Sequence, residues 1–270
     1  MLVVHDLGPE LRLVKLNRPE KRNALTRPLI EELARALDEA RLDQRVRGLV
    51  LAGEGPSFCA GVDLDEFAHG SPESGRALIL ALKDVCAALR ELPKPVACVI
   101  QGHCLGGALE LAACCDFRVC APDARLGMPE VWLGIPSVID AVMLAHHVGV
   151  GRARELLLTG ESIDAETAYR WGLANRLVPR ERLVEAGLEL VGQVSRHDPA
   201  VVAAQKRLHQ QWLELPYTQA VERSVEFLLE SFRAGRPQRI ATDRLRARAD
   251  DRQRLQATPQ PRHDSGGSDE

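Results

Sequence analysis

Residues 96–115 read VACVIQGHCLGGALELAACC, and this stretch decides the expected fold class. Its first five residues are all apolar, which predicts a strand buried on both faces. Residues 102–107 form a glycine-bearing loop, and residues 108–115 continue as an apolar helix. A buried strand that leads through a glycine loop into a helix is typical of parallel α/β sheets, whose ligands bind at the carboxyl ends of the strands.

Strands and helices alternate on both sides of this stretch. The alternating residues Leu11–Leu16 and the apolar residues Gly48–Ala52 predict two further strands. This order predicts βαβ units and a largely parallel sheet with right-handed crossovers. After about residue 150 the pattern becomes helical, and a helix over Thr218–Ala234 carries one apolar face that needs a partner.

The composition is that of an ordinary soluble globular protein, with 270 residues, 45% of them hydrophobic and 27% charged. A formal charge of −3 provides no basic field for nucleic acid, and three Trp, two Tyr and five Phe are few for stacking on bases. We find no basic leader and no apolar run of ~20 residues, so we expect no membrane span and a cytoplasmic location. The seven cysteines lack CxxC spacing, which predicts small buried side chains rather than disulfides or metal ligands.

Two loops at the expected strand ends carry backbone amides suited to binding an anion. They are Ser57–Leu64 and Gly102–Ala108. A strand-to-helix turn exposes free N–H groups, and the start of a helix adds partial positive charge. Two such N–H groups, one from each loop, would form an oxyanion hole. A glycine turn more often only turns the chain, so neither loop alone identifies a site.

Two glutamates lie in apolar surroundings close to these loops. Glu110 is in the first turn of the apolar helix, and Glu130 lies in the run Gly127–Gly134. One interpretation is that each simply starts a helix, where the dipole favours a carboxylate. Because a buried carboxylate without a partner is costly, the other interpretation is that both line a cavity. Beside an oxyanion hole they indicate a general acid–base pair acting on an activated carbonyl.

Taken together, the motifs over roughly residues 10–235 resemble the enoyl-CoA hydratase/isomerase, or crotonase, superfamily. The order and spacing of several segments carry the resemblance. They are Asn17–Pro19 with Asn23–Leu25, Phe58–Leu64, Lys94–Ala97, Gly102–Ala112 with Cys115–Asp116, Met128–Glu130 with Leu133–Gly134, and Leu157–Gly160. The resemblance implies a crotonase-like α/β fold, a spiral of β-β-α units with a C-terminal helical trimerisation region. We expect the spiral core over residues 1–195, the helical oligomerisation region over 196–250 and a disordered tail over 251–270.

The resemblance also assigns catalytic roles. It places the amides of Val62 and Gly107 at the thioester oxygen, where they would stabilise an enolate. It makes Glu110 the base that activates water and Glu130 the acid that protonates the α-carbon. No metal is expected at this site.

The coenzyme A part of the substrate is expected along the first loop. The resemblance places its adenine near the carbonyl of Ala60 and its phosphates near Lys21 and Arg22, although these two residues also suit a solvated basic turn. The expected binding residues are Lys21, Arg22, Ala60, Gly61, Val62, Asp63, Leu64, Gly106 and Gly107.

These roles imply an enoyl-CoA hydratase, a hydro-lyase that adds water across the α,β double bond of a 2-enoyl-CoA to give the 3-hydroxyacyl-CoA. No cofactor is expected beyond the coenzyme A of the acyl-CoA substrate, and the expected assembly is a homotrimer or a dimer of trimers. A Δ3,Δ2-enoyl-CoA isomerase, which needs one glutamate, stays open, as does a non-catalytic acyl-CoA- or RNA-binding relative. The presence of both glutamates favours hydration, whereas the acyl-chain length and the pathway do not follow from the sequence.

One segment departs from the family's pattern. Where the hydratases usually have a glycine-rich loop, residues 135–141 read IPSVIDA, and we expect these bulkier side chains to reshape the acyl pocket. Asp140 is either a third acid near the site or, as we expect, a structural cap or surface residue. His103 is expected to be hydrogen-bonded within its loop rather than catalytic, and Asp63 and Asp116 to be caps or anchors. No serine–histidine pair or GxSxG elbow indicates a hydrolase.

Overall fold

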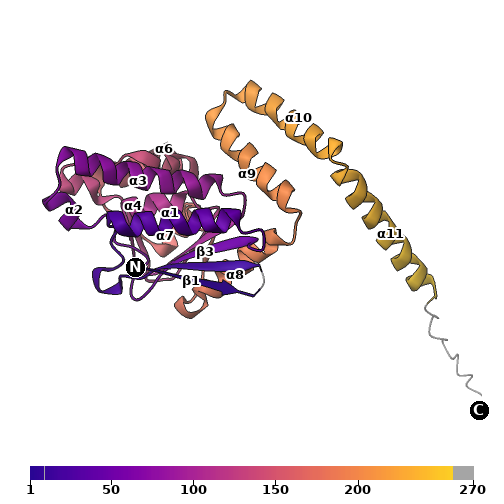
Figure 1. Cartoon of the computed structure of the whole chain (residues 1–270), viewed down its shortest axis with the longest axis horizontal. Coiled ribbons are helices and arrows are strands. Elements are labelled where there is room, and N and C mark those ends of the chain that lie inside the picture. Colours follow the sequence, from indigo (N-terminus) through magenta and orange to yellow (C-terminus); the bar gives the residue numbers. More distant parts are fainter. Residues whose placement is uncertain (9, 258–270) are drawn as a thin grey trace, which may run out of the picture. The chain divides into compact units, whose positions relative to one another are not determined.

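A six-stranded sheet forms the centre of the computed structural model, which describes residues 1–8 and 10–257. The strand order is β1-β2-β3-β4-β6-β9, with β1 antiparallel to β2 and the other neighbours parallel (Figure 1). Their bounds are Leu2–Leu7 (β1), Leu11–Leu16 (β2), Gly48–Gly53 (β3), Val96–Ile100 (β4), Phe117–Cys120 (β6) and Arg176–Leu177 (β9). The expected parallel sheet and the three expected strands are therefore confirmed.

A second, smaller sheet has the order β5-β7-β8, with bounds His103–Leu105, Arg125–Gly127 and Ser162–Asp164. Consecutive strands alternate between the sheets: β4 and β6 lie in the first, and β5 and β7 lie in the second. A bridge between Cys59 and Cys104 joins the segment after β3 to β5 in the same way. Helix α4 (Gly107–Ala113) directly follows β5. This arrangement is the expected succession of β-β-α units.

Helices cover both faces of the first sheet. Leu49 and Leu51 of β3 belong to the core formed with α1 (Arg27–Leu42) and α3 (Pro72–Glu91). Val50, between them, belongs to the core formed with α8 (Leu183–Ser195) (Figure 1). Because both faces are covered, every residue of β3 and β4 is buried, which is why these strands read as continuous apolar runs.

The helix that carries Glu110 is fixed at its C-terminal end by a buried arginine. Arg118 is 3% exposed and donates to the carbonyls of Ala112, Cys115 and Leu173. The bonds to Ala112 and Cys115 hold the C-terminal end of α4, and the bond to Leu173 ties it to the segment that follows α7. The remaining elements of this part of the chain are η1 (Pro19–Lys21), α2 (Leu64–Ala68), η2 (Pro129–Leu133), η3 (Ile139–Val142), α5 (Met143–Val148), α6 (Val150–Thr159), α7 (Ala165–Arg170), η4 (Arg180–Arg182) and α9 (Pro199–Glu214).

The chain divides into two compact units, Met1–Leu213 and Glu214–Glu270. The second unit contains α10 (Tyr217–Arg233) and α11 (Arg236–Ala257). The apolar face expected here is present on α10, with five side chains about half exposed: Val221, Val225, Leu228, Leu229 and Phe232. Its role in oligomerisation stays a prediction. Helix α11 includes the first residues of the expected tail, and residues 258–270 lie outside the described part of the chain.

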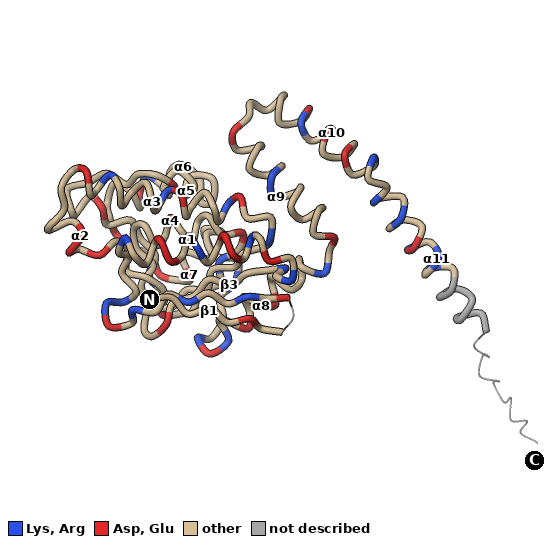
Figure 2. The backbone as a smooth tube through the Cα atoms, viewed as in Figure 1, with Lys and Arg blue, Asp and Glu red and all other residues tan. Residues whose placement is uncertain are grey.

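All seven cysteines are buried with free thiols, so the prediction that they act as small core side chains is confirmed. Positive and negative residues are interspersed along the backbone rather than gathered by sign (Figure 2). Among residues 1–8 and 10–257, none of the helices combines the length and apolar content that crossing a bilayer requires.

Candidate active site

The two loops predicted to carry free amides, Ser57–Leu64 and Gly102–Ala108, lie against each other. The Cys59 N–H donates to the His103 carbonyl at 2.9 Å, and the Leu105 N–H donates to the Cys59 carbonyl at 3.3 Å. Gly61 has φ +96°, and a Cβ there would lie 2.7 Å from the Leu105 carbonyl oxygen. Only glycine therefore permits this close approach of the two loops.

The amides of Val62 and Gly107 are free to bind a ligand. The Gly61 carbonyl accepts from Leu25 N–H at 2.7 Å, and Asp63 N–H donates to the Leu25 carbonyl at 2.9 Å, so the Val62 N–H between them is directed away from Leu25. Gly107 is the first residue of α4. Within the described residues neither N–H donates to a protein acceptor. Two unpaired donors on adjacent loops are suited to stabilising a negatively charged oxygen.

Both amides border a cavity of about 560 Å³. Its lining includes nearly all of the residues predicted from the sequence: Lys21, Ala60, Gly61, Val62, Asp63, Leu64, Gly106, Gly107, Glu110 and Glu130. Arg22 is the exception, because it is exposed and is absent from the lining. Apolar side chains complete the wall: Phe67, Ile79, Leu82, Trp132, Leu133, Ile135 and Val138. The cavity is therefore suited to an apolar chain beside two carboxyl groups.

Glu110 is 3% exposed, and its Oε1 accepts the N–H of Ala141 at 3.0 Å. Burial, and then the charge of Glu130, raises the pKa of Glu110 to about 8, while the hydrogen bond from Ala141 acts in the opposite direction. A carboxyl group with such a pKa exchanges protons near neutral pH, as a general acid or base requires.

Glu130 comes from η2 and is half-buried on the same cavity. Its Oε2 accepts the hydroxyl of Ser137 at 3.1 Å. Burial raises the pKa of Glu130 above its ordinary value, although the Ser137 hydroxyl opposes this. Both glutamates therefore hold a proton more readily than an exposed carboxyl group does, and both face the same cavity.

Gly106 is placed so that no larger residue fits between the loops and Glu130. It has φ +55°, and a Cβ there would collide with Oε1 of Glu130. We expect Gly106→Ala to lower kcat by ~10²-fold, because a displaced acid–base group no longer reaches the substrate. Steady-state kinetics with an enoyl-CoA measure this. Gly134→Ala is the matched control, since Gly134 also has a positive φ but has open space around it. An equal loss of kcat in Gly106→Ala and Gly134→Ala would show that backbone strain alone is responsible.

The first loop is braced by ion pairs. Asp63 caps α2 by accepting the Asp65 N–H at 3.2 Å, and its Oδ2 lies 3.1 Å from Nη1 of Arg18. Its prediction as a loop anchor is confirmed. Lys21 is 54% exposed and lies 3.7 Å from the carboxylate of Asp65. It therefore keeps most of its hydration and is accessible to an anionic group at the mouth of the cavity.

Asp116 is also an anchor, as predicted. Its Oδ2 accepts the Val96 N–H at 2.8 Å and the Lys206 ammonium at 2.6 Å. These contacts fix the start of β4 and hold α9 against it.

Asp140 has a structural contact, as expected, but it is neither a cap nor a surface residue, so that part of the expectation is wrong. It is 6% exposed and forms an ion pair with Arg90 from α3. Its carboxylate contributes to raising the pKa of Glu110, after burial and the charge of Glu130. The sequence carried no signal for this contact, because the two partners are 50 positions apart. Ser137, which contacts Glu130, was also missed, because a serine in a loop has no distinctive pattern.

A serine–histidine pair that the sequence did not reveal joins Ser57 and His103. Oγ of Ser57 lies 3.1 Å from Nδ1 of His103. Ser57 is 2% exposed, and neither residue lines the cavity, so the pair is not placed to attack a substrate. Burial, followed by the charges of Arg22 and Arg125, lowers the pKa of His103. The expectation that His103 is hydrogen-bonded rather than catalytic agrees with this geometry.

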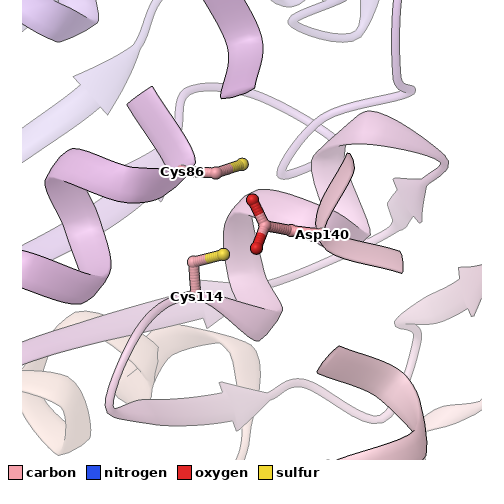
Figure 3. Close-up of side chains that lie close together, drawn as sticks. All are labelled: Cys86, Cys114 and Asp140. Carbon is pink, nitrogen blue, oxygen red and sulfur yellow. The ribbon is translucent and has the colours of Figure 1, made fainter. Parts of the chain in front are cut away.

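Three potential metal ligands lie behind Glu110. The side-chain ends of Cys86, Cys114 and Asp140 point toward one another within 4.8 Å (Figure 3). Nη1 of Arg90 donates to Asp140 and, at 3.5 Å, to Sγ of Cys114. The guanidinium group therefore supplies the positive charge that a metal ion would bring to these ligands.

The fold and the site together define a protein of the crotonase class. A model of the enoyl-CoA hydratase/isomerase family matches residues 9–236, so the chain belongs to this family. The short-chain-enoyl-CoA hydratase of Clostridium acetobutylicum is 33% identical over 207 residues, which cover 76% of this chain and 79% of that protein. The 2,3-dehydroadipyl-CoA hydratase of Escherichia coli is 35% identical over 208 residues, with coverage of 75% and 79%. The crystal structure of an enoyl-CoA hydratase from Bacillus anthracis has a TM-score of 0.81 at 30% identity, covering 87% of this chain and 96% of that one.

Proposed function

We propose that the protein is an enoyl-CoA hydratase, which adds water to a 2-enoyl-CoA and releases a 3-hydroxyacyl-CoA. One observation carries the proposal: two carboxyl groups with raised pKa values line the same cavity as two unpaired backbone amides. According to their names, the two curated relatives given above are hydratases of CoA thioesters. This chain belongs to the enoyl-CoA hydratase/isomerase family.

In the proposed reaction the thioester oxygen lies between the N–H groups of Val62 and Gly107. Glu110, as the carboxylate, removes a proton from water, and the water oxygen bonds to the β-carbon. The electron pair of the double bond moves toward the thioester, and the two amides stabilise the resulting enolate. Glu130, as the acid, then donates its proton to the α-carbon, so that the atoms of one water molecule have been added.

The raised pKa values suit the two proposed proton transfers. Hydration begins with the proton on Glu130 and ends with a proton on Glu110. Burial and the charge of Glu130 raise the pKa of Glu110 to about 8, and a carboxyl group in this range can both accept and release a proton near neutral pH.

Coenzyme A is proposed to lie along residues 60–64, with its adenine near the Ala60 carbonyl. Lys21 lines the cavity and is the better placed of the two predicted phosphate ligands; Arg22 would act from outside the lining. The reaction requires only water as co-reactant, and no metal or redox cofactor is part of the proposal. We also propose a cytoplasmic homotrimer or dimer of trimers, in which the apolar face of α10 is covered by a neighbouring subunit.

The absorbance of the enone thioester tests the proposed activity. With crotonyl-CoA we expect rapid loss of this absorbance, because hydration removes the conjugated double bond. A 3-enoyl-CoA serves as the comparison substrate, since an isomerase would convert it to the 2-enoyl-CoA and the absorbance would rise. Rapid rise with the 3-enoyl-CoA and no loss with crotonyl-CoA would assign the isomerase instead. Binding of a CoA ligand without either reaction would indicate a non-catalytic relative.

A further inference from the structure

A buried ion pair lies directly behind Glu110 and joins three elements. The side chains of Arg90 and Asp140 are 19% and 9% exposed. Arg90 is at the end of α3 and Asp140 is in η3, while Cys114, which also accepts from Arg90, directly follows α4. The guanidinium group therefore links the end of α3 to η3 and to the helix that carries Glu110.

The residue after Asp140 makes the hydrogen bond to the acid–base group. The N–H of Ala141 donates to Oε1 of Glu110, while Oε2 has no hydrogen-bond partner among the described residues. Asp140 and Ala141 are adjacent in sequence, so an ion pair that fixes the first also fixes the amide of the second. Glu110 lines the cavity, and Oε2 is thus the oxygen left for a ligand.

The backbone is strained at Ile139, directly before Asp140, so its conformation is imposed by its surroundings. Ile139 has φ +49°, a left-handed conformation that β-branched residues rarely adopt. Strain of this kind persists only where neighbouring contacts determine the structure, and it is concentrated at functional sites. The contacts that hold this segment include the Arg90–Asp140 pair and the Ala141 N–H, which donates both to Glu110 and, at 3.1 Å, to the Val138 carbonyl.

We infer that Arg90 and Asp140 are positioning residues for Glu110: their ion pair holds residues 139–141 so that the Ala141 amide fixes one carboxyl oxygen and directs the other into the cavity. The inference rests on the proposed function, because it concerns the carboxyl group that activates water. It also explains how this chain positions the segment without the glycine-rich loop that its sequence lacks.

The charges around Glu110 determine in which direction its pKa should change in each variant. The ionisable groups whose charges act on Glu110 are Glu130 from η2 and Asp140 from η3, and the pKa of Cys86 from α3 responds in turn to the charge of Glu110. Arg90 contacts Asp140 and Cys114 beyond them. Arg90 balances the carboxylate of Asp140. Removing Arg90 leaves an additional negative charge near Glu110, whereas neutralising Asp140 leaves an additional positive one.

The test compares Arg90→Met and Asp140→Asn in the full-length protein. We expect Arg90→Met to lower kcat for crotonyl-CoA by ~10-fold to ~100-fold, with KM within a few-fold of wild type. The acidic limb of the kcat–pH profile, which reports the ionisation of Glu110 as the base, should move upward by roughly one pH unit in Arg90→Met. It should move downward in Asp140→Asn, whose amide oxygen still accepts from Arg90. Arg90→Lys, which keeps the charge, should restore most of the kcat and the wild-type limb.

Arg12→Met is the matched control. Arg12 is similarly buried, at 10% side-chain exposure, and forms ion pairs with Asp6 and Asp43 at the far end of β2 from the cavity. The Arg12→Met variant should be less stable than wild type, with no change in its kcat–pH profile. If Arg90→Met behaves like Arg12→Met, with kcat and the acidic limb unchanged, the ion pair is merely structural and the inference is overturned.

A second measurement separates failure of the inference from failure of the proposed function. The infrared carbonyl band of protonated Glu110, identified by its absence in Glu110→Gln, can be followed against pH without any substrate. Opposite shifts of its titration in Arg90→Met and Asp140→Asn support the inference even if crotonyl-CoA is not hydrated. An unchanged titration in both variants, or in Asp140→Asn alone if Arg90→Met does not fold, overturns it.

Discussion

Glu110→Gln and Glu130→Gln are each expected to reduce kcat for hydration of crotonyl-CoA by ~10²-fold to ~10⁴-fold, the range that general acid–base groups contribute. Both effects are large because the two carboxyl groups perform different steps. Glutamine at residue 110 cannot remove a proton from water, and glutamine at residue 130 cannot supply one to the α-carbon. Binding should change little, since an amide has nearly the same size as a carboxyl group and can still accept from Ala141 or Ser137.

The measurement is initial-rate kinetics with crotonyl-CoA, together with the affinity of each variant for a non-reacting CoA ligand. Glu31→Gln, an exposed glutamate on α1, is the control for the chemical change itself and should leave kcat unchanged. If either Glu110→Gln or Glu130→Gln retained most of its activity, one carboxyl group would suffice. That result would favour the isomerase, in which a single glutamate moves the proton.

The same substitution at residue 110 is expected to make the folded protein more stable above neutral pH. Burial, followed by the charge of Glu130, raises the pKa of Glu110 from 4.5 to about 8 in the folded state. Between these two values the folded state binds a proton that the unfolded state has lost, so the stability of the wild type falls as the pH rises. Below about pH 4.5 this loss is absent, and above about pH 8 it is complete.

The size of this loss of stability follows from the shift in the pKa of Glu110. At about 1.4 kcal/mol per pKa unit, the free energy of unfolding loses a few kcal/mol by pH 8. Glutamine carries no charge and avoids this cost, although its N–H₂ group must also find an acceptor in a site that is 3% exposed. For a chain of this size each kcal/mol corresponds to about 2–4 °C in Tm. We therefore expect Glu110→Gln to melt several degrees higher than wild type at pH 8.

Thermal unfolding of both proteins between pH 5 and pH 9 measures the difference. The gain should shrink as the pH falls toward 5, because keeping the proton on Glu110 in the folded state costs less free energy as the pH approaches the unfolded pKa of 4.5. Glu31→Gln should show no such trend. A Glu110→Gln variant that is less stable at pH 8, or whose difference from wild type does not depend on pH, would contradict the raised pKa of Glu110.

In the main sheet, β3 and β4 could be predicted because burial on both faces leaves an apolar run, and β2 because its residues alternate, whereas β1, β6 and β9 were not predicted. β3 and β4 are continuous apolar runs, and the glycine loop after β4 indicates where the sheet ends. The second sheet was not predicted as a separate sheet. Each of its strands has only three residues, which is too short for any periodicity to distinguish it from a loop.

The two glutamates could be predicted because a carboxylate in an apolar run is unusual wherever it occurs. Their supporting residues could not. Arg90 and Ser137 are common surface types at unremarkable positions, and their importance comes from contacts with Asp140 and Glu130 that only the folded chain creates. For the same reason the sequence suggested a surface role for Asp140, which is buried.

The most direct test of the central claim is the mass of the product formed from crotonyl-CoA in ¹⁸O-labelled water. Hydration predicts one solvent oxygen, in the 3-hydroxyl group, in each molecule of 3-hydroxybutyryl-CoA, with no label at any other position and a rate ~10²-fold to ~10⁴-fold lower in Glu110→Gln. A product that contains no solvent oxygen, or unchanged crotonyl-CoA beside a 3-enoyl-CoA that is isomerised, would contradict hydration.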